Sequence, residues 1–231
     1  MTNQLKVSMY KWRRFWVLYV AYVILGAVGI TYGYLKLSPA EGAYEGFLAT
    51  ISDTSFVFII TMVTAGFVGS DFSNRTIQHE ITTGHSRLSV ILVRALPVFL
   101  SAISMHVLYI VSTMIGIWIK SGTMGQHFTG QDILWLVTVL MQVAAVQSII
   151  QWIAFLCRNA VVGIAASILF TFMTCNVLRN FMESRIFTIS VFCFVRESSY
   201  ETLIPALMIA IVVIFGMLFL TYQTFRKAEL R

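Results

Sequence analysis

Charged residues are scarce in this chain. Only 11% of its 231 residues are Asp, Glu, Lys or Arg, whereas 58% are hydrophobic. A soluble domain carries roughly 25% charged residues, so this chain cannot cover a surface that faces water. The composition excludes a soluble globular protein and predicts a single membrane domain over residues 1–231.

Cysteine pairs and enzyme motifs are also missing. The three cysteines, Cys157, Cys175 and Cys193, form no CxxC pair, which leaves a zinc or redox site without support. There is no phosphate-binding loop, no G-x-S-x-G elbow and no pair of carboxylates within an apolar run. His79-Glu80 begins like a zinc-protease helix, but Thr83 stands where the second histidine is needed. We expect no catalytic residue, no metal site and no cofactor bound by the chain.

Long apolar runs dominate what is present. A bilayer core needs about 20 apolar residues per helix. The runs predict an all-α membrane protein with six transmembrane helices, at 16–35, 51–69, 90–119, 133–156, 160–178 and 203–222.

The Lys and Arg residues predict the orientation. With the N-terminus inside, eleven of them fall on the inner side and five on the outer side, as membrane proteins prefer. Both termini are then cytoplasmic. Basic residues beside membrane spans also explain the net charge of +6, so no nucleic acid is expected as a partner.

Two segments outside the predicted spans, one before span one and one between spans five and six, also have informative patterns. In residues 1–15, Leu5, Met9, Trp12 and the following Trp16 recur at helical spacing. This stripe predicts an amphipathic helix in the inner interface, the alternative being a disordered basic tail. Residues 186–195 are apolar but too short to span, so 179–201 is predicted as an outer re-entrant or surface hairpin before span six.

Polar residues inside apolar spans are expensive and therefore candidates for function. His106 lies in the third predicted span, and Gln147 and Gln151 share a face of the fourth. Two readings stay open. These side chains form hydrogen bonds between helices, or they line a path for a substrate.

Small residues at four-residue spacing mark close helix contacts. Gly29 and Gly33 form such a pair in span one, and Gly163 and Ser167 form another in span five. The pairs could serve packing within the chain or a contact between two subunits.

The inner loop at 70–87 is the most informative segment. Ser73 or Asn74 can cap a helix there and Gly84 can end it. Ile77 and Ile81 fall on one face of that helix. An exposed apolar pair is suited to a partner's groove, the alternative being a surface turn that packs on its own bundle.

This loop resembles that of ABC-2 type transporter permeases, especially small ones of Gram-positive bacteria that serve bacteriocin or lantibiotic export or immunity. The pattern is a span, then Gly-x-Asp-Phe-x-x-x-Thr-Ile, a short helix, Gly-His-Ser-Arg and the next span. Many members have glycine where this chain has Arg75. The matching positions are Asp71, Phe72, Thr76, Ile77, Gly84, Ser86 and Arg87.

The resemblance implies a permease subunit in a bacterial plasma membrane. Two such subunits, identical or paralogous, would work with two separate ABC ATPase subunits that bind ATP and Mg. A hydrophobic peptide, bacteriocin or drug is the first guess at the exported substrate, and spans one and five would help to form the dimer. An intramembrane enzyme and a non-catalytic scaffold or sensor are the alternatives. The loop helix would couple to the ATPase through Asp71, Phe72, Arg75, Thr76, Ile77, Glu80, Ile81 and Arg87.

Overall fold

The computed structural model describes residues 2–36, 42–125, 128–174, 190–192, 194–196 and 198–226. Within these ranges the regular structure is helical and contains no strand, so the predicted all-α class is confirmed. The helices are α1 (Thr2–Arg14), α2 (Trp16–Lys36), α3 (Ala43–Ile51), α4 (Val57–Ser73), α5 (Thr76–Thr82), α6 (Arg87–Ser121), α7 (Gly130–Cys157), α8 (Ala160–Thr171) and α11 (Tyr200–Arg226).

Four of the helices are long and apolar enough to cross a membrane: Trp16–Leu35, Arg87–Ser121, Gly130–Cys157 and Tyr200–Arg226. They correspond to four of the six predicted spans. The other two do not qualify by length and composition alone. α4 reaches the required length only together with α5, across a bend of 57°, and the apolar helix that begins at Ala160 is described only as far as Thr174.

The second predicted span is displaced in the structure. Residues 43–51 form the separate helix α3, and α4 begins only at Val57. Asp53 lies in the break, where it accepts hydrogen bonds from the Ser55 backbone N–H at 2.8 Å and from the Tyr109 hydroxyl at 2.9 Å. The Asp53 carboxylate thus bonds both within the break and to α6, and the second predicted span begins at Val57 rather than at residue 51.

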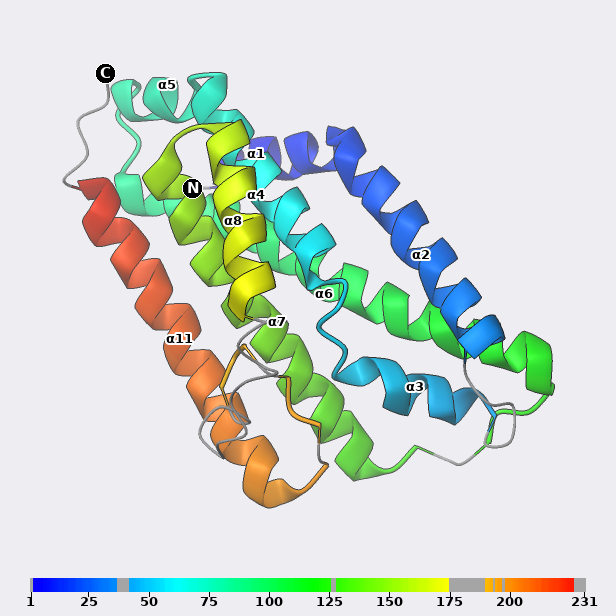
Figure 1. Cartoon of the computed structure of the whole chain (residues 1–231). Helices are drawn as coiled ribbons and strands as arrows, with labels where there is room; N and C mark the ends of the chain where they lie inside the picture. Colours follow the sequence, from blue (N-terminus) through cyan, green and yellow to red (C-terminus); the bar gives the residue numbers. More distant parts are fainter. Residues whose placement is uncertain are drawn as a thin grey trace.

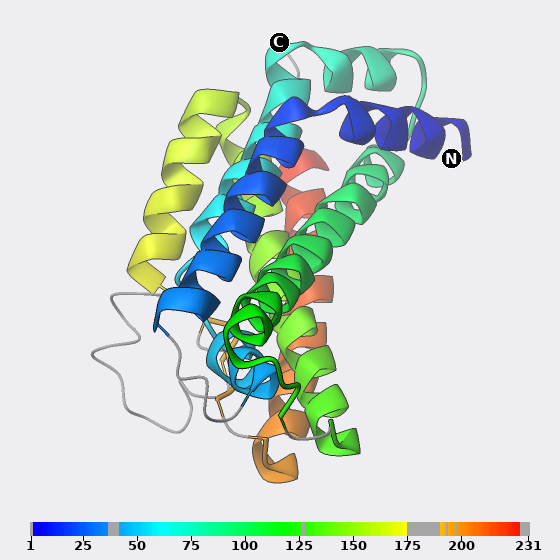
Figure 2. The same cartoon turned by 90° about the vertical axis from the view of Figure 1, so that its right-hand side faces the viewer.

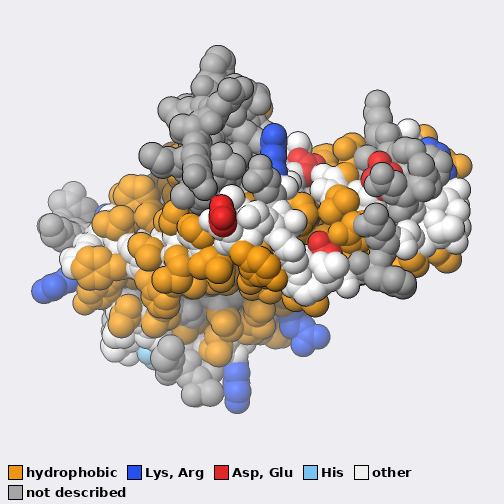
Figure 3. Space-filling model, turned by 90° about the horizontal axis from the view of Figure 1, so that it is seen from below, with side chains coloured by type: hydrophobic (Ala, Val, Ile, Leu, Met, Phe, Trp, Pro, Cys, Tyr) orange, Lys and Arg blue, Asp and Glu red, His pale blue; other side chains and the backbone are white. Residues whose placement is uncertain are grey.

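The helices form one bundle in which α2 lies along α6 and α11 lies along α7, with α4 and α8 packed against each other (Figure 1). α1 and α5 both lie across one end of this bundle (Figure 2). Hydrophobic side chains cover much of the face seen from below (Figure 3). Phe215 and Val212 of α11 are 68% and 67% exposed. A surface of this kind fits lipid rather than water.

The two ends of the bundle differ in their charged side chains. The end with α1 and α5, called the basic end below, carries Lys6, Lys11, Arg13, Arg14, Arg75, Arg87, Arg94, Arg158 and Arg226 together with only two described carboxylates, Asp71 and Glu80. Among the described side chains, the opposite end carries Lys120 and Arg196 together with Glu45, Asp53, Asp132 and Glu201. The residues Lys227 and Arg231, used in the charge count above, lie outside the described part.

The predicted outer hairpin, 179–201, falls largely outside the described residues, as do Cys175 and Cys193. Its described part is non-helical before α11 and packs on α7. Gln142 donates to Ser190 O at 3.0 Å and accepts from the Val195 backbone N–H at 3.2 Å. Trp135 donates to Val195 O at 2.6 Å. This segment therefore closes the opposite end of the bundle against α7.

The small residues Gly29 and Gly33 are used within the chain. A Cβ added at Gly29 would collide with Ser112, and one added at Gly33 would collide with the Thr113 backbone, both on α6. In return, Gly116 of α6 lies against the Ile30 backbone of α2. Of the two alternatives, this geometry favours packing within the chain for Gly29 and Gly33, because α6 occupies the space beside them.

The second pair of small residues is used in the same way. Gly163 faces Ala154 and Cys157 of α7, and Ser167 has no exposed surface. For Gly163 and Ser167 too, the contacts favour packing within the chain over a subunit contact. Close approach of helices is what these residues provide, but the partner helices belong to the same chain.

Candidate functional site

The loop at 70–87 folds as a bend, a short helix and a cap at the basic end. α4 ends at Ser73 and α5 begins at Thr76, with Arg75 as its N-cap residue in the left-handed region at φ 56°. Neither Ser73 nor Asn74 caps α5, so that prediction is wrong. Glycine adopts such a φ without steric penalty. The backbone at position 75 would therefore also suit a glycine.

The end of α5 is as predicted. Gly84 has φ 92°, its N–H donates to Ile81 O at 3.0 Å, and the His85 N–H donates to Glu80 O at 3.1 Å. These two bonds make a Schellman cap. Ser86 then caps α6 by accepting a hydrogen bond from the Ser89 backbone N–H at 3.2 Å.

The apolar face of α5 points into the bundle. Ile77 has no exposed surface and joins a core cluster with Phe72, Phe155 and Phe225. Ile81 is partly buried against the same cluster. The contacts favour the alternative, a turn that packs on its own bundle, because the chain's own core surrounds Ile77 and partly covers Ile81.

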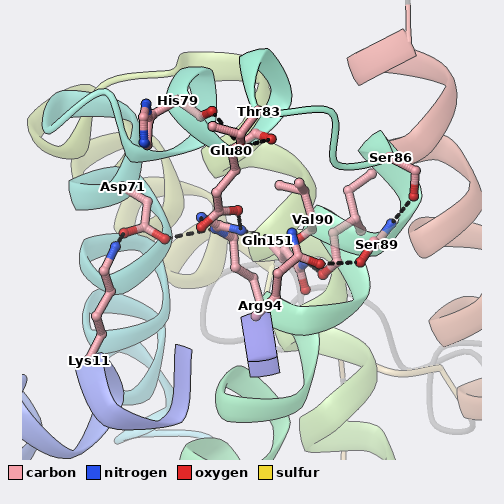
Figure 4. Close-up of polar contacts among 12 residues, drawn as sticks. Lys11, Asp71, His79, Glu80, Thr83, Ser86, Ser89, Val90, Arg94 and Gln151 are labelled. Atoms are coloured by element: carbon pink, nitrogen blue, oxygen red, sulfur yellow. Dashed lines mark hydrogen bonds and ion pairs between the residues drawn. The ribbon is translucent and has the colours of Figure 1, made fainter. Parts of the chain in front are cut away.

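A buried network of charges holds α5 in place (Figure 4). At its centre is Arg94 of α6, which is only 2% exposed. Its Nε donates to Asp71 at 2.7 Å, and its two terminal nitrogens donate to the two carboxylate oxygens of Glu80 at 2.9 and 3.1 Å. Lys11 donates to the other oxygen of Asp71 at 3.2 Å. The network thus joins α1, α4, α5 and α6.

The geometry of the network explains why a guanidinium is present. Arginine carries several N–H donors in a rigid, planar fork, and Arg94 uses them on two carboxylates and on Val90 O at 3.2 Å. The two cations, Lys11 and Arg94, balance the two anions, Asp71 and Glu80. A buried ion pair is weak evidence of net stability, whereas loss of one partner is strongly destabilising. The network therefore fixes the relative position of four helices.

Arg87 makes a second link from the loop to the bundle. It donates to the backbone oxygens of Phe225 and Arg226 at the end of α11, and its guanidinium lies 5.5 Å from the centre of the Phe225 ring. A cation suits the C-terminus of a helix, where carbonyl groups lack helical partners. Arg87 thus ties the start of α6 to the end of α11.

The predicted coupling residues divide into two groups. Asp71, Phe72 and Ile77 are buried, while Thr76, Glu80, Ile81 and Arg87 are partly buried. Arg75 is exposed. The surface that α5 and its flanks offer to a partner is polar, and it consists of Ser73, Asn74, Arg75, His79, Thr82, Thr83, Gly84, His85 and Ser86.

The predicted polar path does not form one track. His106 is hydrogen-bonded to Ile51 O at 3.1 Å and contacts the Phe194 ring. Gln151 donates to Ile91 O at 3.2 Å. Ile91 and His106 are fifteen positions apart in α6, or roughly 22 Å along a helix that rises 1.5 Å per residue. His106 therefore belongs to the opposite half of the bundle from Gln151.

Sequence reasoning missed Arg94 and Lys11 as members of the site. Both were treated only as charges that set the orientation. A signal for Arg94 exists, since it lies inside an apolar run seven residues after Arg87, where an unpaired cation would be costly.

The site is built from ion pairs and helix caps. The network's charged atoms are bonded to one another, and in the part of the chain that the structure describes no three His, Cys, Asp or Glu side chains lie close enough to hold a metal ion. The arrangement can carry a displacement of α5 to α1, α4 and α6.

Comparison of the chain with family models, with curated proteins and with solved structures found no match in any of the three. The function is therefore inferred from the residues and geometry of the chain itself.

Proposed function

We propose that this chain is the membrane-spanning permease subunit of an ATP-binding-cassette exporter of the ABC-2 type, driven by separate ATPase subunits. The observation that carries the proposal is α5, a capped helix at the basic end held by Arg94 to α4 and α6. A partner that moves α5 would move membrane helices directly, because the links are buried and charged. The loop resemblance at Asp71, Phe72, Thr76 and Ile77 points to the same assignment.

In this proposal the chain crosses the membrane six times, through α2, α4, α6, α7, α11 and the helix that begins with α8. The basic end faces the cytoplasm of a bacterium, since cytoplasmic flanks carry the excess of Lys and Arg. α1 lies in the inner interface. Two permease copies, or a copy and a paralogue, would form the transporter, with ATP and Mg on the ATPase subunits. The substrate would be a hydrophobic peptide, bacteriocin or drug.

The orientation is tested by single cysteines placed at the two ends in a background without native cysteine. Asn74→Cys and Thr123→Cys both alter exposed residues, one beside α5 and one after α6. An impermeant thiol reagent added to intact cells should label Thr123→Cys and leave Asn74→Cys unlabelled until the membrane is opened. Labelling of Asn74→Cys in intact cells would contradict the orientation.

The ATPase partner is tested by copurification with an ATP-binding-cassette ATPase encoded beside the gene. We expect wild-type chain to retain it and His79→Glu with Thr82→Glu to lose at least ten-fold of it. Both residues are exposed on α5, so the spans should stay folded. Ser55→Glu with Thr123→Glu adds the same charge at exposed positions of the opposite end and should retain the ATPase. Normal copurification and transport by the α5 variant would remove α5 from the contact, and the absence of any ATPase partner would favour a scaffold or sensor.

A further inference from the structure

Several buried side-chain polar atoms without a hydrogen-bond partner belong to α4, α7 and α8, while others are on Gln4, Trp12, Glu45 and Gln78. The side chains in these three helices are Thr64 of α4, Gln147 and Gln151 of α7, and Ser167 of α8. Each is at most 1% exposed. Both amide atoms of Gln147, Oε1 of Gln151 and both hydroxyl oxygens have no hydrogen-bond partner. Most buried side-chain polar atoms in proteins do have one, so this group calls for a physical explanation.

The two hydroxyls differ from most buried Ser and Thr hydroxyls in the described helices. A buried Ser or Thr in a helix normally satisfies its hydroxyl on a carbonyl of the preceding turn. Thr64 and Ser167 have no such bond. Buried residues that do donate in this way are Thr50, Thr61, Ser101, Ser112, Thr113, Thr138, Ser148, Thr171 and Thr221.

Contacts between α4 and α8 place Thr64 level with Ser167. The hydroxyls of Thr61 and Thr171 are 3.2 Å apart. At the other end of the contact, a Cβ on Gly69 would lie 2.6 Å from Ala160 Cα. The helices run in opposite directions, so Thr64, one turn after Thr61, lies level with Ser167, one turn before Thr171.

Contacts between α7 and α8 place Ser167 beside the glutamines. Gly163 faces Ala154 and Cys157 of α7, and these helices also run in opposite directions. One turn further along α8, Ser167 is level with Ile150, which lies between Gln147 and Gln151 in the sequence. All four polar side chains therefore lie at one level of the bundle.

We propose that Thr64, Gln147, Gln151 and Ser167 form an internal polar site that binds water between α4, α7 and α8. Buried waters in proteins typically make about three hydrogen bonds to otherwise unsatisfied polar groups. The site offers donors and acceptors of both kinds, because a hydroxyl does both and Gln147 has a free amide nitrogen and a free oxygen. One or two waters would satisfy the group.

The site continues the charge network of the basic end into the bundle. Gln151 uses its Nε2 on Ile91 O, and Arg94 uses a nitrogen on Val90 O. These carbonyls belong to adjacent residues on one turn of α6, where Gln151 and Arg94 lie together (Figure 4). The inference goes beyond the proposed transport function and does not depend on it.

Thermal unfolding of the purified chain distinguishes water binding from an unpaired amide. If Gln147 is bonded to water, Gln147→Met should lower the midpoint by about 2–4 °C, the shift that roughly 1 kcal/mol produces in a chain of this size. If Gln147 has no partner, the same change should raise the midpoint, since it removes an unsatisfied polar group, and the proposal is overturned. Gln142→Met is the matched control, because both ends of that amide are bonded to the 190–195 segment, and it should lower the midpoint.

A double substitution and a structure complete the test. Gln147→Met with Ser167→Ala should lower the midpoint by less than the sum of the single changes, because both side chains bind the same water. Strict additivity would overturn the shared site. An experimental structure at a resolution that shows ordered water should place a water within hydrogen-bond distance of at least two of the four side chains. Side chains bonded only to one another or to backbone would overturn the proposal.

Discussion

Arg94→Met is expected to lower the free energy of unfolding by about 3–5 kcal/mol, which is the usual loss when one partner of a buried ion pair is removed. The substitution keeps an apolar stem of similar length but withdraws the donors that Asp71 and Glu80 accept. Lys11 still contacts one oxygen of Asp71, whereas Glu80 retains no contact that the network provided. Denaturant unfolding in detergent, followed by circular dichroism, measures the loss.

Three further variants separate the loss of charge pairing from the loss of packing. Arg94→Met combined with Asp71→Asn and Glu80→Gln should recover most of the stability, because neutral amides are less costly to bury than unpaired carboxylates. Arg94→Lys should fall between wild type and Arg94→Met, since an ammonium cannot reproduce the fork. Arg13→Met is the control on an exposed arginine and should change stability by no more than about 0.5 kcal/mol. Wild-type stability for Arg94→Met would show that the network does not hold α5.

The long apolar spans could be read from the sequence because their cause is local. A run of about 20 apolar residues is sufficient for a span, and the predicted 16–35, 90–119, 133–156 and 203–222 each match a long helix. The break between α3 and α4 could not be read in this way. Asp53 in the break bonds to Tyr109 of α6, which lies fifty-six residues away in the chain and is not visible in a local pattern.

The direction of the apolar face of α5 shows a different limit of prediction from sequence. The spacing of Ile77 and Ile81 correctly places them on one side of a short helix, but helical periodicity does not say whether that side meets a partner or the chain's own core. The answer lies with Phe72, Phe155 and Phe225, which come from three other helices. Gly84 was predictable because its reason is local, a left-handed backbone at the end of a helix.

Arg94 was missed because the orientation rule counts each Lys and Arg by its side of the membrane and does not consider which residues it contacts in the folded chain. Its partners Asp71 and Glu80 were both singled out in the loop, yet nothing in the spacing joins them to a residue inside the next apolar run. The pairing arises from the bend of 57° between α4 and α5, which folds Glu80 back over the start of α6. A buried cation in an apolar helix, beside a loop with two carboxylates, is the combination that would reveal such a network in a sequence.

Gly33→Leu and Gly116→Leu are each expected to destabilise the chain by about 3 kcal/mol or more, at the upper end of the usual cost of overpacking. A Cβ at Gly33 would collide with the Thr113 backbone, and one at Gly116 would collide with the Ile30 backbone. Backbone cannot rotate away as a side chain can, so α2 and α6 must separate along their whole contact. Gly26→Leu is the matched control, since it adds the same side chain to α2 where nothing lies within 4 Å of a new Cβ, and it should be close to neutral.

Unfolding of the monomer in detergent measures these effects independently of any subunit contact. If Gly33→Leu instead left the monomer as stable as Gly26→Leu and only reduced the mass of a larger complex, the glycines would belong to a contact between subunits and the packing of α2 on α6 would be wrong.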